Sequence, residues 1–211
     1  MLISLIVGVS HINVETRTLI YENEPGKPAE YQLYERVVSA KGISLITKTI
    51  VPGDDISIAQ SDFTLDGTPL MTRQEGQWND RWNIFETTYS PHSATQNING
   101  ECTTTKMEAS ALRNPQVLWF WKTHPKIGDS TTVTFLAQNT IAKFKIRFTY
   151  EADETMTLKG RKVTLHRVRE KPLSAPDGVY TIWWYDDLGM GVKRYHKTTT
   201  SEFKTELYSW R

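Results

Sequence analysis

The feature that most constrains this chain is a repeated alternation of apolar and polar residues in short segments bounded by turn residues. Residues 31–38 read YQLYERVV and residues 43–51 read ISLITKTIV, with Lys41-Gly42 between them. Further segments of this kind cover residues 56–65, 69–73, 101–109, 130–137, 142–151, 161–170, 179–185 and 191–196. Segments this close together leave little room for crossover helices, so they predict a meandering antiparallel sheet.

One segment breaks the alternation. Residues 114–124 read NPQVLWFWKTH, and Asn114 followed by Pro115 suits the N-cap and first turn of a helix. Its middle is apolar around most of the circumference, which is typical of a buried helix. We therefore expect a short aromatic helix packed against the sheet. Residues 74–83 and 90–100 are expected to form the longest loops.

Charge and cysteine content exclude several classes of protein. The formal net charge is +1 at pH 7, and acidic and basic residues are spread evenly along the chain. A nucleic-acid binder normally carries a basic face or arm, so we expect no nucleic-acid partner. Cys102 is the only cysteine, which rules out an intrachain disulfide. Because no linker or change in composition interrupts the 211 residues, we expect one β domain over residues 1–211.

The first residues, MLISLIVGV, are apolar but too short to span a membrane. Residues 1–10 match either the remnant of a signal peptide or an edge strand that continues into the next segment. A signal peptide has a charged start and an Ala-x-Ala cleavage site, and both are missing here. The edge strand is therefore favoured, and we expect the chain not to span a membrane.

A succession of turn and strand motifs runs through the C-terminal half. The segment VLWFWKTHP precedes Ile127-Gly128-Asp129, and later strands lead to YTIWWYDD and GMGVKR. The recurring positions of this pattern are Lys122, Pro125, Gly128, Asp129, Trp184, Asp186, Val192 and Lys193. The succession resembles the spiral β-roll domain, a domain of unknown function in uncharacterised bacterial envelope proteins. The resemblance implies a long sheet that curls on itself and favours an extracytoplasmic location, and it supplies no activity.

Together these features predict an all-β fold. We expect a long antiparallel sheet rolled into an open barrel or spiral β-roll, with one short aromatic helix near residues 114–124. Such a sheet has a concave apolar surface, where a small hydrophobic molecule could bind.

The densest chemistry lies in residues 180–195, YTIWWYDDLGMGVKRY. Asp186 and Asp187 are adjacent at the end of a strand, where successive side chains point to opposite faces, so they cannot act as an acid–base pair. Residues 186–189 are instead typical of a tight turn. Trp183 and Trp184 also point to opposite faces, which indicates that both faces are covered or that one lines a cavity. Arg194 or Lys193 is placed to stack on these rings.

The leading functional hypothesis is a non-enzymatic binding or carrier protein for a small apolar or amphipathic ligand. The candidate ligand-binding residues are Trp119, Trp121, Trp183, Trp184 and Arg194. No motif for a cofactor, a phosphate loop or a metal site is present, so we expect neither cofactor nor metal, and no catalytic residue is assigned.

Two alternatives stay open. The first is a small β-barrel enzyme, such as an isomerase, cyclase or hydrolase, with a buried His166, His196 or Glu151 in its cavity. The second is a structural or interaction module with an exposed apolar patch or sheet edge. Trp78 and Trp82 could contact a ligand from an exposed loop, although anchoring of that loop in the core is the favoured role. Cys102 is expected to be a buried or partly buried structural cysteine.

Overall fold

A computed structural model describes residues 12–24, 27–51, 56–78, 80–107, 119–120, 123–136, 142–158, 160–187, 189, 191–200 and 202–210. Its strands are β1 (Asn13–Glu24), β2 (Lys27–Ser39), β3 (Gly42–Ile50), β4 (Ile56–Phe63), β5 (Pro69–Trp78), β6 (Arg81–Ser90), β7 (Ser93–Ile98), β8 (Glu101–Lys106), β9 (Ser130–Leu136), β10 (Lys143–Leu158), β11 (Arg161–Pro172), β12 (Tyr180–Tyr185), β13 (Gly191–Lys197) and β14 (Glu202–Trp210). Trp119, Phe120 and Thr123 are helical and lie within the predicted helix. The rest of that prediction, and the one for residues 1–10, fall mostly outside the described residues.

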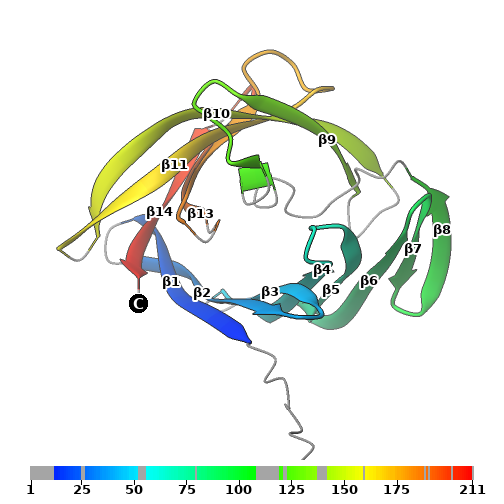
Figure 1. The fold of residues 1–211 in the computed structure, drawn as a ribbon. Helices are drawn as coiled ribbons and strands as arrows, with labels where there is room; N and C mark the ends of the chain where they lie inside the picture. The colour runs from blue at the N-terminus through cyan, green and yellow to red at the C-terminus, as the bar shows by residue number, and fades with distance from the viewer. Residues whose placement is uncertain are drawn as a thin grey trace, which may run out of the picture.

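All these strands belong to one 14-stranded antiparallel sheet, in the order β8-β7-β6-β5-β4-β3-β2-β1-β14-β13-β12-β11-β10-β9. β1 lies inside this order, between β2 and β14, so the first and last strands are neighbours. β8 and β9 are the two ends of the sheet, and the described residues form no ladder between them. The sheet curls so that β1–β8 form one wall and β9–β11 the opposite wall, with the helical turn on the inner side (Figure 1). The predicted all-β fold with an open, rolled sheet is confirmed.

Two of the turns between strands follow from local backbone chemistry. Ser39 pairs with Gly42, which closes the β2–β3 hairpin next to the predicted Lys41-Gly42 turn. Gly67 has a φ of 76° and its amide donates to the carbonyl of Thr64 at 2.8 Å, so Asp66-Gly67 also forms a turn. Positive φ is accessible to glycine without steric cost, and this is why glycine occupies the position.

The prediction of two long loops is wrong. Residues 74–83 form most of the β5–β6 hairpin, and residues 90–100 contain β7 and its turn. Asn99 and Gly100 have φ values of 52° and 98°, the left-handed pair that a two-residue hairpin turn requires. β7 was missed because its sequence, SATQNI, is polar, yet Ala94 and Gln96 are both buried on one face.

Two layers of the curled sheet meet in one apolar core. Its buried members are Tyr34, Leu45, Phe63, Leu165, Trp184 and Val192, which come from β2, β3, β4, β11, β12 and β13. Trp184 and Leu165 therefore belong to the same core as Leu45, although their strands are far apart in the order of the sheet. This core connects parts of the sheet that are distant in strand order.

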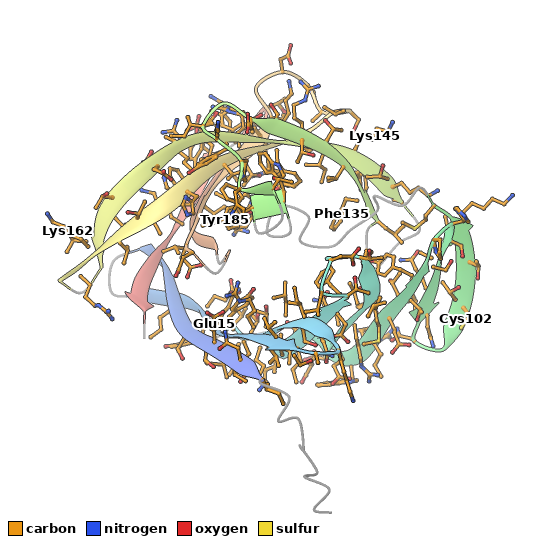
Figure 2. The ribbon with its side chains drawn as sticks, viewed as in Figure 1. Glu15, Cys102, Phe135, Lys145, Lys162 and Tyr185 are labelled. Atoms are coloured by element: carbon orange, nitrogen blue, oxygen red, sulfur yellow. The ribbon has the colours of Figure 1, made fainter. Side chains whose placement is uncertain are left out.

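A second core lies on the other face of β12. Phe148, Val168 and Tyr185 are buried there, and Trp119, Phe120, Val133, Ile146 and Trp183 pack against them. Figure 2 shows Tyr185 and Phe135 on the inner side of the curl and Lys145 on its outer side. β12 thus has a core on each face, as predicted from its adjacent tryptophans. No helix among the described residues is long and apolar enough to span a membrane.

Truncating the first core tests whether it holds the two layers together. Leu165 is 1% exposed, and we expect Leu165→Ala to lower the free energy of unfolding by roughly 2–5 kcal/mol, because the cavity would remain largely unfilled. Leu65→Ala is the matched control, since Leu65 is 57% exposed, and its effect should lie within about 0.5 kcal/mol. Urea denaturation measures both. Equal effects would contradict the role of this core.

Candidate functional site on the inner face of β12

The β12–β13 hairpin positions the site. The amide of Gly189 donates to the carbonyl of Asp186 at 3.0 Å, and Gly189 has a φ of 79°, so the predicted turn is confirmed. Asp186 is 2% exposed whereas Asp187 is exposed. The two carboxyl groups lie in different environments and do not act as a pair.

Trp183 is at the centre of the site. Its Nε1 donates to Oε2 of Glu170 on β11 at 2.8 Å. The guanidinium of Arg194, its cross-strand partner on β13, lies 5.3 Å from the ring centroid, within the range of a cation–π contact. Tyr185, two residues along β12, stacks beside it with ring centroids 5.9 Å apart. One indole ring therefore contacts an acidic, a basic and an aromatic side chain.

Gly191 lets this indole lie close to the backbone of β13. A Cβ atom at residue 191 would lie 3.0 Å from Cε3 and 3.1 Å from Cζ3 of Trp183, which is tighter than ordinary van der Waals contact. The glycine pairs with Tyr185 at an irregular step in the β12–β13 register. A larger residue there would displace the ring at the centre of the site.

The helical turn brings further aromatic rings to this face. Trp119 and Phe120 contact each other edge to face at 5.4 Å, and both pack against the second core. Phe120 also meets Tyr150 of β10 edge to face, with centroids 4.9 Å apart. We call Trp119, Phe120, Glu170, Trp183, Tyr185 and Arg194 the inner-face site.

Glu170 is the acidic group of the inner-face site. Burial raises the pKa of its carboxyl, and the hydrogen bond from Trp183 and the charge of Arg194 oppose this effect only in part. Low solvent access disfavours the charged form of a carboxyl group, so the direction is the expected one. A proton is therefore held more readily at Glu170 than at an exposed glutamate.

A hydrogen-bonded group of three side chains lies beside the helical turn. His166 Nδ1 and Asp153 Oδ1 are 2.7 Å apart, and the hydroxyl of Tyr150 donates to the same carboxyl oxygen. Burial alone would raise the pKa of Asp153, but the hydrogen bonds from Tyr150 and His166 outweigh burial and lower it. Phe120 covers the imidazole at 5.4 Å. The ionised Asp153 orients the His166 ring.

The structure brings together three of the predicted ligand-binding residues. Trp119, Trp183 and Arg194 share the inner-face site. Trp184 lies on the opposite face in the first core, where its Nε1 donates to Glu154 Oε2 at 2.7 Å and Lys193 lies 5.0 Å from its ring. Trp121 lies outside the described residues. The sequence predicted that Arg194 or Lys193 would stack on these rings, and the structure places both residues over a tryptophan ring.

The predicted titratable candidates do not converge. His166 is paired with Asp153, whereas Glu151 accepts hydrogen bonds from Arg167 and Arg169. His196 lies 2.8 Å from the hydroxyl of Thr181, at another level of the sheet. In the part of the chain that the structure describes, no group of three or more His, Cys, Asp or Glu is placed to hold a metal ion.

Two further predictions are wrong. Cys102 is exposed on β8, because this short strand ends the sheet and almost all its side chains face solvent. Trp82 is 57% exposed on β6 and does not anchor a loop in the core. The side chain of Trp78 lies outside the description.

Glu170, Asp153 and Tyr150 were not predicted. One signal for Glu170 was present in the sequence, since alternation along RKVTLHRVREKP places Glu170 on the same face as Val168. A carboxyl group on the apolar face of a strand indicates a buried titratable group. Asp153 gave no such signal. An irregular step in the β10–β11 register between Tyr150 and Ala152 changes which face of the sheet the following side chains of β10 point to.

No family model matches the sequence, and no curated protein matches it. The fold is similar to the crystal structure of a β-barrel-like protein of domain of unknown function DUF1849 from Brucella abortus. The TM-score is 0.58, and the match covers 95% of this chain and 96% of that chain at 9% sequence identity. The fold is β-barrel-like. This similarity spans nearly the whole chain, beyond the C-terminal half to which the sequence motifs were confined, and at this identity it concerns the fold alone.

The raised pKa of Glu170 predicts a dependence of stability on pH. The ordinary value is 4.5, and the folded protein holds the proton above it. The resulting stabilisation is fully present below pH 4.5 and is lost as the pH rises through the folded-state pKa. The free energy of unfolding should therefore fall with pH across this interval in the wild type and fall less in Glu170→Gln.

Urea denaturation at a series of pH values measures this difference. Glu86→Gln is the matched control. It removes a carboxylate of β6 that lies beside Arg73 of β5. Parallel pH curves for the wild type and Glu170→Gln would contradict the burial of a protonated Glu170.

Proposed function

We propose that this protein is a non-enzymatic binding or carrier protein for a small amphipathic molecule held on the concave face of the sheet. The ligand contacts Trp119 and Trp183 with its apolar part and Arg194 with its polar part. Trp121 belongs to the same proposal. The spiral β-roll family and the extracytoplasmic location that the sequence motifs imply are also part of it, as is a single domain over the whole chain.

The single observation that carries the proposal is the composition of the inner-face site. Trp183 contacts one carboxyl group, one guanidinium group and Tyr185, and Trp119 and Phe120 pack against the same core. Ligand sites in proteins are mostly apolar and aromatic, with a few fixed polar groups that orient the ligand. The site has this composition on the inner side of a curled sheet.

The polar pair favours an amphipathic ligand over a purely apolar one. A wholly apolar ligand would leave the charge of Arg194 and the carboxyl of Glu170 beside hydrocarbon, which is unfavourable. An anionic or hydrogen-bonding head group would interact with the guanidinium while its chain lies along the rings. Trp184 is left out of the contact set, since it packs in the first core.

Native mass spectrometry on protein purified without denaturation tests for a co-purified small molecule, and titration with a dansyl-labelled fatty acid tests the site. We expect Trp183→Leu to weaken binding of the probe about tenfold or more, because the ring is the central contact. Trp82→Leu is the matched control: it removes an exposed tryptophan on β6 and should leave binding unchanged.

A second pair of variants separates loss of binding from loss of folding. Arg194→Gln should weaken binding of the probe, whereas Arg73→Gln on β5 should not, and circular dichroism checks that each variant is folded. A wild type that binds no probe and carries no co-purified molecule would refute the carrier hypothesis.

An enzymatic function is the second candidate, because Asp153 orients His166 through Nδ1. A carboxylate in this position holds the imidazole so that Nε2 can act as a general base. In a hydrolase, His166 would take a proton from a water that attacks an ester carbonyl, and it would return the proton to the alcohol as the ester C–O bond breaks. No nucleophilic side chain is assigned to the site.

Hydrolysis of p-nitrophenyl esters tests this candidate. If the protein is a hydrolase, the wild type should release p-nitrophenolate and His166→Gln should lose this activity. His196→Gln should retain it, because that histidine contacts Thr181 and not the Asp153 carboxyl. Release at the same rate by His166→Gln and the wild type would exclude a role for His166.

A further inference from the structure

The outer face of β2–β6 carries two rows of side chains that run across the strands. Buried residues of these strands, such as Leu45 and Thr72, point to the inner face, so their neighbours along the chain point outward. The ladder registers place Tyr31, Ile50, Ile56, Gln77 and Trp82 side by side in the first row. The second row, two residues further along, is Leu33, Lys48, Ile58, Glu75 and Ile84.

Much of this surface is apolar and open to solvent. Tyr31, Ile50, Ile56, Trp82 and Ile84 are all exposed large hydrophobic residues. Cross-strand neighbours have Cβ atoms about 5 Å apart, so these side chains form a contiguous patch rather than scattered contacts. Contiguous exposed apolar patches in soluble proteins mark interaction surfaces.

The order of residues within the rows matches a second copy of the same chain. Two copies can be placed with their outer faces against each other, related by a two-fold axis that lies between them and runs parallel to β4. In this arrangement β3 of one copy faces β5 of the other, and β2 faces β6. Tyr31 then meets Trp82, Leu33 meets Ile84, and Ile56 meets Ile56 of the other copy. An isologous interface requires this kind of self-complementarity.

The charged residues match in the same arrangement. Lys48 of one copy faces Glu75 of the other, and the symmetry repeats the pair. Within one copy, Lys48 and Glu75 lie on opposite sides of β4, and their nearest ionic partners are Glu35 at 3.7 Å and Arg73 at 2.9 Å. The next row across the strands is Glu35, Ile46, Gln60, Arg73 and Glu86. In the same arrangement Glu35 of one copy would face Glu86 of the other, and this repulsion limits the contact to the first two rows.

We propose that the outer faces of β2–β6 associate two copies of this chain into a symmetric dimer, centred on Ile56 and Ile58 and oriented by the Lys48–Glu75 pairs. Two rows of five residues are fewer than the roughly 20–30 residues that each partner contributes to a standard interface. The dimer is therefore weak. It leaves the inner face of the sheet uncovered.

Sedimentation velocity over a concentration series that reaches the millimolar range tests the dimer. The wild type should show reversible monomer–dimer association, and Ile56→Asp should be monomeric throughout. Val14→Asp is the matched control. Val14 is also exposed on the outer face, but it lies on β1 opposite Val37, outside the two rows, so its substitution should leave the association unchanged.

A charge reversal tests the orientation. Lys48→Glu alone should weaken association by about tenfold or more, because it places two glutamates against each other at both symmetric positions. The double variant Lys48→Glu with Glu75→Lys should restore association. Restoration cannot come from within one chain, since both intramolecular partners, Glu35 and Arg73, would then face like charges.

A wild-type protein that stays monomeric at the highest concentration would overturn the proposal. So would a dimer that Ile56→Asp leaves intact. A dimer that the double variant does not restore would overturn the assigned orientation. Circular dichroism of each variant confirms that the monomer is folded, so that loss of association is measured on intact protein.

Discussion

The packing of β12 between two apolar cores is the interaction on which the rest of the structure depends. The sheet does not close through a strand ladder, because β8 and β9 form none with each other in the described chain. A rolled sheet without a closing ladder needs another source of stability, and here the packing of apolar side chains supplies it. Trp184 and Leu165 share one core with Leu45 and Phe63, while Trp183 and the helical turn pack against the core that contains Tyr185.

This arrangement gives the two tryptophans of β12 different tasks. Alternation along a strand sends adjacent side chains to opposite faces, so Trp184 packs in the core and Trp183 meets the charged groups of the inner-face site. The ring of Trp183 is held by Glu170, by Tyr185 and by the short approach to Gly191. A site on a strand fixed from both sides is more rigid than one on a loop.

The sequence predicts local features well and long-range ones poorly. Alternation predicted most strands, and Gly189 predicted the turn of the β12–β13 hairpin. The polar strand β7 escaped because its buried positions hold Ala94 and Gln96 rather than large apolar residues. The partnership of Trp183 with Glu170 depends on the register between β11 and β12, which no local pattern specifies. Trp184 was assigned to ligand binding because a sequence cannot say which face of a strand another layer covers.

The pairing of β1 with β14 has a consequence for how the chain folds during synthesis. β1 is synthesised before all the other described strands, but Leu19 pairs with Trp210 of β14, which is synthesised after them. One edge of β1 therefore waits, unpaired, until almost all other strands have been made. Contacts at such separation in sequence slow folding and leave strand edges open to aggregation in the meantime.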